Sequence, residues 1–307
     1  MTKVTAAIVL LIAGLLSGCF FGPGKDNGAE KVKDTVATMP GVTRTGFSTN
    51  EEGLATVTLP NLYVMMTTAT PQQIRAVVDV LKNNPHKDLE TVNITVSEKP
   101  TISVNGTVAD IDASQFVDDV ERLRQLAPAV GQAAAIKWTR DGMPEGDLYV
   151  TVGSPVAATL TTIRETLGQI GRAEISPGPS SRVWDWKINF PFPPDQERHV
   201  NAQLDSVPGQ IGSVTVDSGV ITELSVTVTS SLAAESQLST IIAALDAGPG
   251  SPLMLSWYVG QLSASRPDGT VHVGACGYPS TPYGDNLSPE EKALQERVRE
   301  QYDSCPR

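Results

Sequence analysis

Histidine is the side chain that most readily acts as a base or a metal ligand near neutral pH, and the sequence contains three: His86, His199 and His272. We expect them in a loop, on a helix and on the polar face of a strand. No short pair of histidine, cysteine or carboxylate residues has the ligand spacing of a zinc site on a helix or hairpin. The sequence therefore predicts ordinary surface histidines and no bound metal.

The other side chains that are able to catalyse a reaction are not arranged for it. Two pairs of carboxylates, Asp118-Asp119 and Glu290-Glu291, are adjacent in the sequence, and adjacent residues on a helix point in different directions. We interpret both pairs as parts of solvated helix faces. No serine lies in a nucleophile-elbow context, and the sequence has neither a phosphate-binding loop with a lysine nor a glycine fingerprint after a strand. We predict no catalytic residue and no cofactor.

Four aromatic residues are candidates for contacts with a ligand. Trp184 and Trp186 could line a groove for a sugar or a peptide, but Ile188 continues the same face of the strand, which favours a buried core. Tyr278 and Tyr283 lie in a segment rich in glycine, proline and serine, and we expect them to be exposed.

The chain begins with a short apolar run behind a single positive charge. Lys3 precedes residues 4–16, about thirteen apolar residues, whereas a helix that spans a membrane needs about twenty. This length favours a signal peptide for export. The run ends in Leu16-Ser17-Gly18-Cys19, which resembles the lipobox of bacterial lipoproteins. The resemblance covers residues 1–19 and does not extend into the rest of the chain.

The resemblance implies that the thiol of Cys19 receives a diacylglyceryl group and that cleavage leaves Cys19 as the new N-terminus. Two acyl chains suffice for stable anchoring. The protein would then be held on the extracytoplasmic face of a cell membrane, with 1–18 as the signal peptide and 19–28 as the lipidated cysteine and a flexible tether. The alternative is a conventional signal peptide that ends by chance at a cysteine.

If Cys19 is lipidated, Cys276 and Cys305 remain as an even pair in an oxidising compartment, where disulfides persist. We predict a disulfide between them, with two free thiols or metal ligation as the alternatives. A bond that closes this loop of about thirty residues would stabilise the fold by about 3–4 kcal/mol on the chain-entropy model.

The composition narrows the choice of partners. The 307 residues are 40% hydrophobic, which is enough to build folded cores, and the formal net charge is −11. No basic cluster is present, so we expect no binding to nucleic acid. Strong negative charge also disfavours close contact with anionic lipid headgroups. The lipid on Cys19, rather than the protein surface, would therefore provide the contact with the membrane.

The most informative feature of the remaining sequence is an internal repeat. Three stretches of about eighty residues share one predicted order of elements, which is helix, strand, strand, helix, strand. Met39-Pro40-Gly41, Ala127-Pro128-Ala129 and Val207-Pro208-Gly209 occupy equivalent places in the three stretches, where each predicts the end of a helix. The strands alternate apolar and polar residues, so one face of each sheet would be solvated and the other covered by helices.

We therefore predict an α+β fold of tandem two-layer α/β sandwich modules, followed by a C-terminal helix. In element order alone, the module resembles small two-layer modules of the BON or ferredoxin-like kind. The predicted modules are residues 29–108, 109–192 and 193–276.

Local signals place several elements within these modules. Thr70-Pro71-Gln72-Gln73 has the residues of a capped helix start, with a hydroxyl at the N-cap, proline at the first position and glutamine at the third. Alternating residues predict a strand over Ala55–Met65. Ser154-Pro155 begins a predicted helix whose apolar stripe runs from Leu160 to Ile170.

The last segment, 277–307, is predicted to be a loop and a helix. Ser288-Pro289-Glu290-Glu291 has the residues of a capped helix start, and Leu294, Val298 and Tyr302 fall on one face of that helix. A bond from Cys305 to Cys276 would attach the helix to the third module.

These observations favour a lipoprotein without enzymatic activity that binds or scaffolds a protein partner in the cell envelope. Tandem sheets offer extended surfaces and edge strands for such contacts. One alternative is a carrier of an apolar or cell-wall-derived ligand, with a cavity between helices and sheet. Another is an enzyme that acts on the cell wall, which would need two carboxylates, or a histidine and a nucleophile, in one cleft.

Overall fold

The fold is a curved two-layer α/β structure made of repeated units. The computed structural model describes residues 28–48, 61–85, 89–140, 145–153, 155–167, 170–178, 180–262, 266–277 and 287–306. The helices in these ranges are α1 (Gly28–Ala37), α2 (Pro71–Asn83), α3 (Ala113–Val130), α4 (Val156–Thr166), α5 (Pro194–Ser206), α6 (Ser231–Ala244) and α7 (Pro289–Tyr302). The strands are β1 (Arg44–Ser48), β2 (Asn61–Met65), β3 (Thr91–Glu98), β4 (Thr101–Thr107), β5 (Ala135–Arg140), β6 (Gly146–Thr151), β7 (Ile170–Ser176), β8 (Val183–Asn189), β9 (Ile211–Asp217), β10 (Val220–Val228), β11 (Leu253–Val259) and β12 (Gly269–Val273).

The repeating unit is a helix followed by two strands. It occurs six times in the described residues, about every forty residues, and α7 follows the sixth unit. The prediction of repeated two-layer α/β units with a C-terminal helix is confirmed. Each predicted five-element stretch corresponds to nearly two of the observed units, so the smaller repeat is helix–strand–strand.

The twelve strands in the described ranges belong to one sheet, and their order in the sheet is their order along the chain. Within a unit the two strands are antiparallel, as in β3 and β4. Between units the neighbouring strands are parallel, as in β4 and β5, and the helix of the next unit connects them. The strands on either side of the predicted module boundaries are paired in the same way, through β4–β5 and β8–β9. The predicted modules therefore share one continuous sheet.

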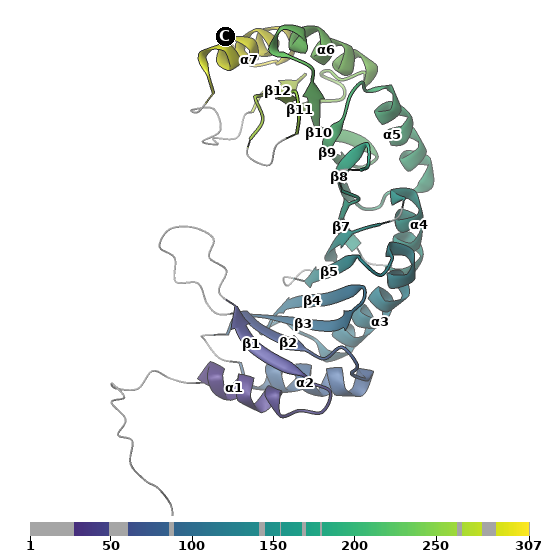
Figure 1. The fold of residues 1–307 in the computed structure, drawn as a ribbon, viewed down its shortest axis with the longest axis vertical. Coiled ribbons are helices and arrows are strands. Elements are labelled where there is room, and N and C mark those ends of the chain that lie inside the picture. Colours follow the sequence, from purple (N-terminus) through teal and green to yellow (C-terminus); the bar gives the residue numbers. More distant parts are fainter. Residues whose placement is uncertain are drawn as a thin grey trace, which may run out of the picture.

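The helices lie on the outer, convex side of this sheet, and the strands line the concave side of a C-shaped molecule (Figure 1). The core forms between the two layers. In β3, for example, Val92, Ile94 and Val96 are buried, while the residues between them are partly exposed on the other face. In α2, the residues that face the sheet are Ile74, Val77, Val78 and Leu81. Burying each such side chain contributes about 1.5–3 kcal/mol.

Several predicted elements are confirmed in detail. At the start of α2, the Gln73 N–H donates to Thr70 Oγ1 at 3.3 Å, and the Thr70 N–H donates to Gln73 Oε1 at 2.8 Å. At the start of α7, the corresponding bonds between Ser288 and Glu291 measure 3.2 and 2.6 Å. The strand predicted over Ala55–Met65 is observed as β2, and residues 55–60 lie outside the described part of the chain.

Two predicted helix ends are wrong. The helix that begins near Pro155 ends at Thr166, and Ile170 belongs to β7. Helical spacing of apolar residues suggested a longer helix, but Gly168 and Gly171 disfavour helix at this point in the sequence. In α3, Pro128 lies inside the helix, which continues to Val130. Val130 is fully buried, so its packing supports a last turn that contains the proline.

The predicted disulfide is present. Cys276 and Cys305 are bonded, with their Cα atoms 4.8 Å apart. Leu294 and Val298, which were predicted to share one face of this helix, are both buried. The bond attaches the end of α7 beside the end of β12. None of the helices in the described ranges is long and apolar enough to cross a membrane.

Candidate functional site

The residues considered for catalysis do not come together. His199 is exposed on α5, His272 is half-buried on β12, and His86 lies outside the described residues. Burial, and then the positive charge of Arg299, lowers the pKa of His272, against the opposite effects of Glu223 and Asp303. Within the described ranges, no three histidine, cysteine or acidic side chains form a group that could bind a metal ion.

The two tryptophans have different surroundings. Trp186 is 6% exposed and belongs to the core, as predicted. Trp184 is half-buried, and its Nε1 is a buried donor that has no hydrogen-bond partner among the described residues. Cys19, Tyr278 and Tyr283 lie outside the described residues.

The interpretation of Asp119 as a solvated carboxylate is wrong. Asp118 is exposed, but Asp119 is 3% exposed and forms a bidentate ion pair with Arg140 at 2.7 and 3.0 Å. The indole N–H of Trp138 donates to the same carboxylate at 3.0 Å. Every oxygen of this carboxylate is therefore occupied by a protein donor. The arrangement joins α3 to β5 and leaves Asp119 unsuited to act as a free base.

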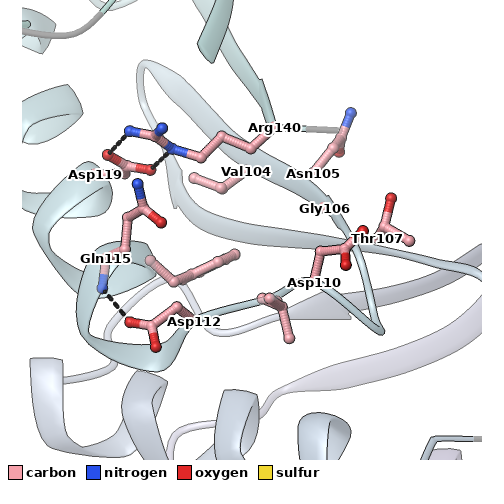
Figure 2. A pocket seen from close by; sticks show the side chains of 11 residues that line it. Val104, Asn105, Gly106, Thr107, Asp110, Asp112, Gln115, Asp119 and Arg140 are labelled. Atoms are coloured by element: carbon pink, nitrogen blue, oxygen red, sulfur yellow. Dashed lines mark hydrogen bonds and ion pairs between the residues drawn. The ribbon is translucent and has the colours of Figure 1, made fainter. Parts of the chain in front are cut away.

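A cavity of about 440 Å³ opens beside this ion pair, between the end of β4 and the start of α3. Figure 2 shows the Asp119–Arg140 pair on one side of it and Asp110 and Asp112 on the other. Asp112 caps α3, and its hydrogen bonds from the Gln115 and Ser114 N–H groups, followed by the charge of Lys82, lower its pKa against the effect of burial. Besides these charged groups, the lining includes the apolar side chains of Val104, Ile111 and Phe116.

A larger set of chemically active side chains lies on the concave face of the sheet. Strand registers align them in two adjacent rows that run across the strands, with about 4.8 Å between neighbours. The first polar row consists of Tyr63, Asn93, Asn105, Thr139, Asp147, Arg172 and Asn189. The second polar row consists of Lys137, Tyr149, Glu174, Lys187, Thr215 and Glu223.

Neighbouring side chains within the first polar row are hydrogen-bonded to one another. The amide of Asn93 donates to the amide oxygen of Asn105, and Asn105 donates to Thr139 Oγ1 at 3.4 Å. In the second polar row, Thr215 Oγ1 donates to Glu223 at 3.0 Å. These bonds hold the side chains in fixed positions on the open face.

The two rows meet on β5–β8 in a cluster of charged and aromatic groups. Arg172 donates to Asp147 at 2.9 Å and to the hydroxyl of Tyr149 at 3.1 Å. The Lys137 ammonium lies 5.7 Å from the centre of the Tyr149 ring. Glu174 pairs in register with Lys187. We refer to these residues as the central cluster, which contains Lys137, Asp147, Tyr149, Arg172, Glu174 and Lys187.

The electrostatics of the central cluster differ from those of the whole chain. Three cations and two carboxylates give it a formal charge of +1, whereas the chain carries −11. Asp147, Tyr149 and Glu174 act together to raise the pKa of Arg172, against the effect of burial, which is the largest single influence. The side chains of Arg172 and Asp147 remain 43% and 40% exposed, so both can reach a partner. Such an arrangement can recognise another molecule by charge, hydrogen bonds and aromatic contact.

Sequence reasoning did not identify the central cluster. Its members come from four strands, and their proximity depends on strand register, which the sequence does not display. The sequence does show charged and aromatic residues at alternate positions of β5–β8, and this pattern could have indicated a polar binding face. The helix predicted over Leu160–Ile170 also overlaps the start of β7, the strand that carries Arg172. Comparisons of the chain with protein-family models, with curated proteins and with solved structures find no match.

Proposed function

We propose that this protein is a lipid-anchored, extracytoplasmic binding protein without enzymatic activity, whose concave sheet face receives a protein partner in the cell envelope. The observation that carries the proposal is the pair of polar rows, which extends across most of the open face of one continuous sheet. The Leu16-Ser17-Gly18-Cys19 sequence supports the anchor, through Cys19.

The chemistry of the central cluster favours a protein over other partners. Tyrosine and arginine are enriched in protein interfaces, where a few such residues contribute most of the binding energy. Charges of both signs on this face suit a folded protein surface, which also presents both signs. A polyanion would instead be repelled by the remaining acidic surface.

Photo-crosslinking in intact cells tests the proposed surface. A photoreactive amino acid in place of Tyr149 should capture a discrete protein, and the same residue in place of Leu232 should not. Leu232 is a matched control because it is 99% exposed on α6, on the convex side. Reversal of two charges, with Arg172→Glu and Lys187→Glu, should abolish capture at position 149. Equal capture at both positions, or capture of glycan in place of protein, would contradict the proposal.

Fatty-acid labelling tests the proposed anchor independently. The Cys19→Ala protein should lose the label and leave the membrane fraction. A Cys276→Ala, Cys305→Ala protein should keep both, because only the thiol at position 19 would carry acyl chains. Retention of label without Cys19 would show that the membrane attachment lies elsewhere.

A further inference from the structure

The last strand of the sheet does not end in an open edge. The N–H of Thr270 on β12 donates to Gln295 Oε1 at 2.9 Å, and its carbonyl accepts from Arg299 Nε at 3.0 Å. The N–H of Gly274 donates to the carbonyl of Tyr302 at 2.9 Å. Helix α7 thus occupies hydrogen-bonding groups that a thirteenth strand would use.

Helix α7 is held in this position from several sides. Leu294 and Val298 are buried beneath it, and Arg297 forms an ion pair with Glu235 on α6 at 3.2 Å. The hydroxyl of Tyr302 donates to Ser239 on α6 at 2.6 Å. The disulfide from Cys305 to Cys276 closes the far end. An edge strand left open would be a template for pairing with another chain.

The opposite end of the sheet is different. Among the described residues, β1 pairs with β2 alone, through antiparallel registers from Arg44–Met65 to Ser48–Asn61. Figure 1 shows β1 and β12 at opposite ends of the crescent. One molecule therefore presents both ends of the sheet, with β12 covered by α7 and β1 paired only with β2 among the described residues.

The internal junctions show which kind of strand could pair with each end of the sheet. Each of the five junctions between units joins the second strand of one unit to the first strand of the next in parallel: β2–β3, β4–β5, β6–β7, β8–β9 and β10–β11. β12 is a second strand and β1 is a first strand. At the internal junctions, a second strand such as β12 pairs with a first strand such as β1. Every copy of the chain has both edges, so β12 of one copy could pair with β1 of another.

We infer that the edges of β12 and β1 form a latent head-to-tail interface between two copies of this chain, which α7 holds closed. Displacement of α7 allows β1 of a second copy to pair with β12 as the first strand of a seventh unit. Because the two edges differ, the contact is heterologous and propagates along a growing chain of molecules or closes into a ring.

A decapped variant tests this inference on the full chain. Gln295→Ala with Arg299→Ala removes the two side chains that bond to Thr270, and a second form adds Cys276→Ser and Cys305→Ser. The control changes Lys292 and Glu296 to alanine, since both are exposed on α7 and contact neither β12 nor α6 in the bonds described. Sedimentation should show dimers and larger species for the decapped variants, in proportion to concentration, and single chains for the control.

Mixing with the unaltered protein separates specific pairing from aggregation. An unaltered copy offers β1 but has a capped β12, so it should add to a decapped copy and then stop further growth. Labelled unaltered protein in excess should therefore convert the larger species into shorter ones that contain the label. The form that keeps the disulfide retains more of the attachment of α7, so it should assemble less than the form without the disulfide, and this order separates release of α7 from general unfolding. Decapped chains that stay single, or assemblies that exclude the labelled protein, would overturn the inference.

Discussion

At the scale of single residues, the buried pair Asp119–Arg140 is the contact whose loss should be most costly. The two side chains are 4% and 13% exposed, and Trp138 is the other donor to the carboxylate. Arg140→Ala would leave a buried charge without its counterion, which costs about 3–5 kcal/mol in the free energy of unfolding. Urea unfolding followed by circular dichroism measures this loss.

A surface pair provides the comparison for this prediction. Arg198 and Asp195 on α5 are also in contact, at 2.5 Å, but their side chains are 72% and 86% exposed. Arg198→Ala should therefore change the free energy of unfolding by about 0–1 kcal/mol. Similar losses for the two arginine variants would contradict the role assigned to burial.

His272 should make stability depend on pH. Burial and Arg299 lower its pKa from the ordinary value of 6.5, so the folded state binds fewer protons than the unfolded state in the range just below that value. The free energy of unfolding should therefore fall as pH decreases through about 6.5. His272→Gln should flatten this dependence between about pH 7.5 and about pH 5, measured by urea unfolding at each pH. An unchanged slope would assign the dependence to other groups.

At this scale the sequence predicted the capping residues, because a cap depends on residues only three positions apart. It also predicted the disulfide partners, because only two cysteines remain if Cys19 is lipidated. It did not predict the burial of Asp119. That burial depends on Trp138 and Arg140, which lie on β5 across from α3. The central cluster could not be predicted from the sequence for the same reason, since its members are brought together only by the register of the strands.

At the scale of elements, close packing of a tryptophan on a glycine recurs in two hairpins. Trp138 on β5 covers Gly146, and Trp257 on β11 covers Gly269. A methyl group at either glycine would overlap the indole ring, and both tryptophans are almost fully buried. The absence of a side chain at these positions therefore makes room for the largest residues of the core.

Gly269→Ala tests this packing. The overlap with Trp257 should lower the free energy of unfolding by about 1–3 kcal/mol, as overpacking of a core generally does. Gly250→Ala is the control, because a methyl group there meets no atom within 4 Å. Urea unfolding of both variants gives the comparison, and equal stability of the two would refute the packing argument.

Elements with strong periodicity or caps, such as α2 and α7, could be predicted almost to the residue. The segment from Leu160 to Ile175 could not, because its apolar spacing fits a helix as well as a helix followed by a strand. Tertiary structure decides between them. Ile170, Ala173 and Ile175 are buried on β7, which pairs with β6 on one side and β8 on the other.

At the scale of the whole molecule, the sequence showed the repetition but did not show that the repeated units form one continuous sheet. Apolar and polar alternation predicted sheets with one covered face, which is confirmed. Whether the units form separate sheets or one sheet depends on pairing between units, as between Ile102 on β4 and Ile136 on β5. Residues on both sides of such junctions are buried, so each unit completes the core of its neighbour.

This continuity leads to a prediction about fragments of the chain. A fragment of residues 109–192 would contain two units, and both β5 and β8 would lose their neighbouring strands. In repeat structures each unit is stable only through its neighbours, and about three or more units are needed. We therefore expect residues 109–192 to be largely unfolded, whereas residues 29–192, with four units, should retain a cooperative urea transition. Circular dichroism and urea unfolding of the two fragments test this, and an independently folded 109–192 would restore the view of separate modules.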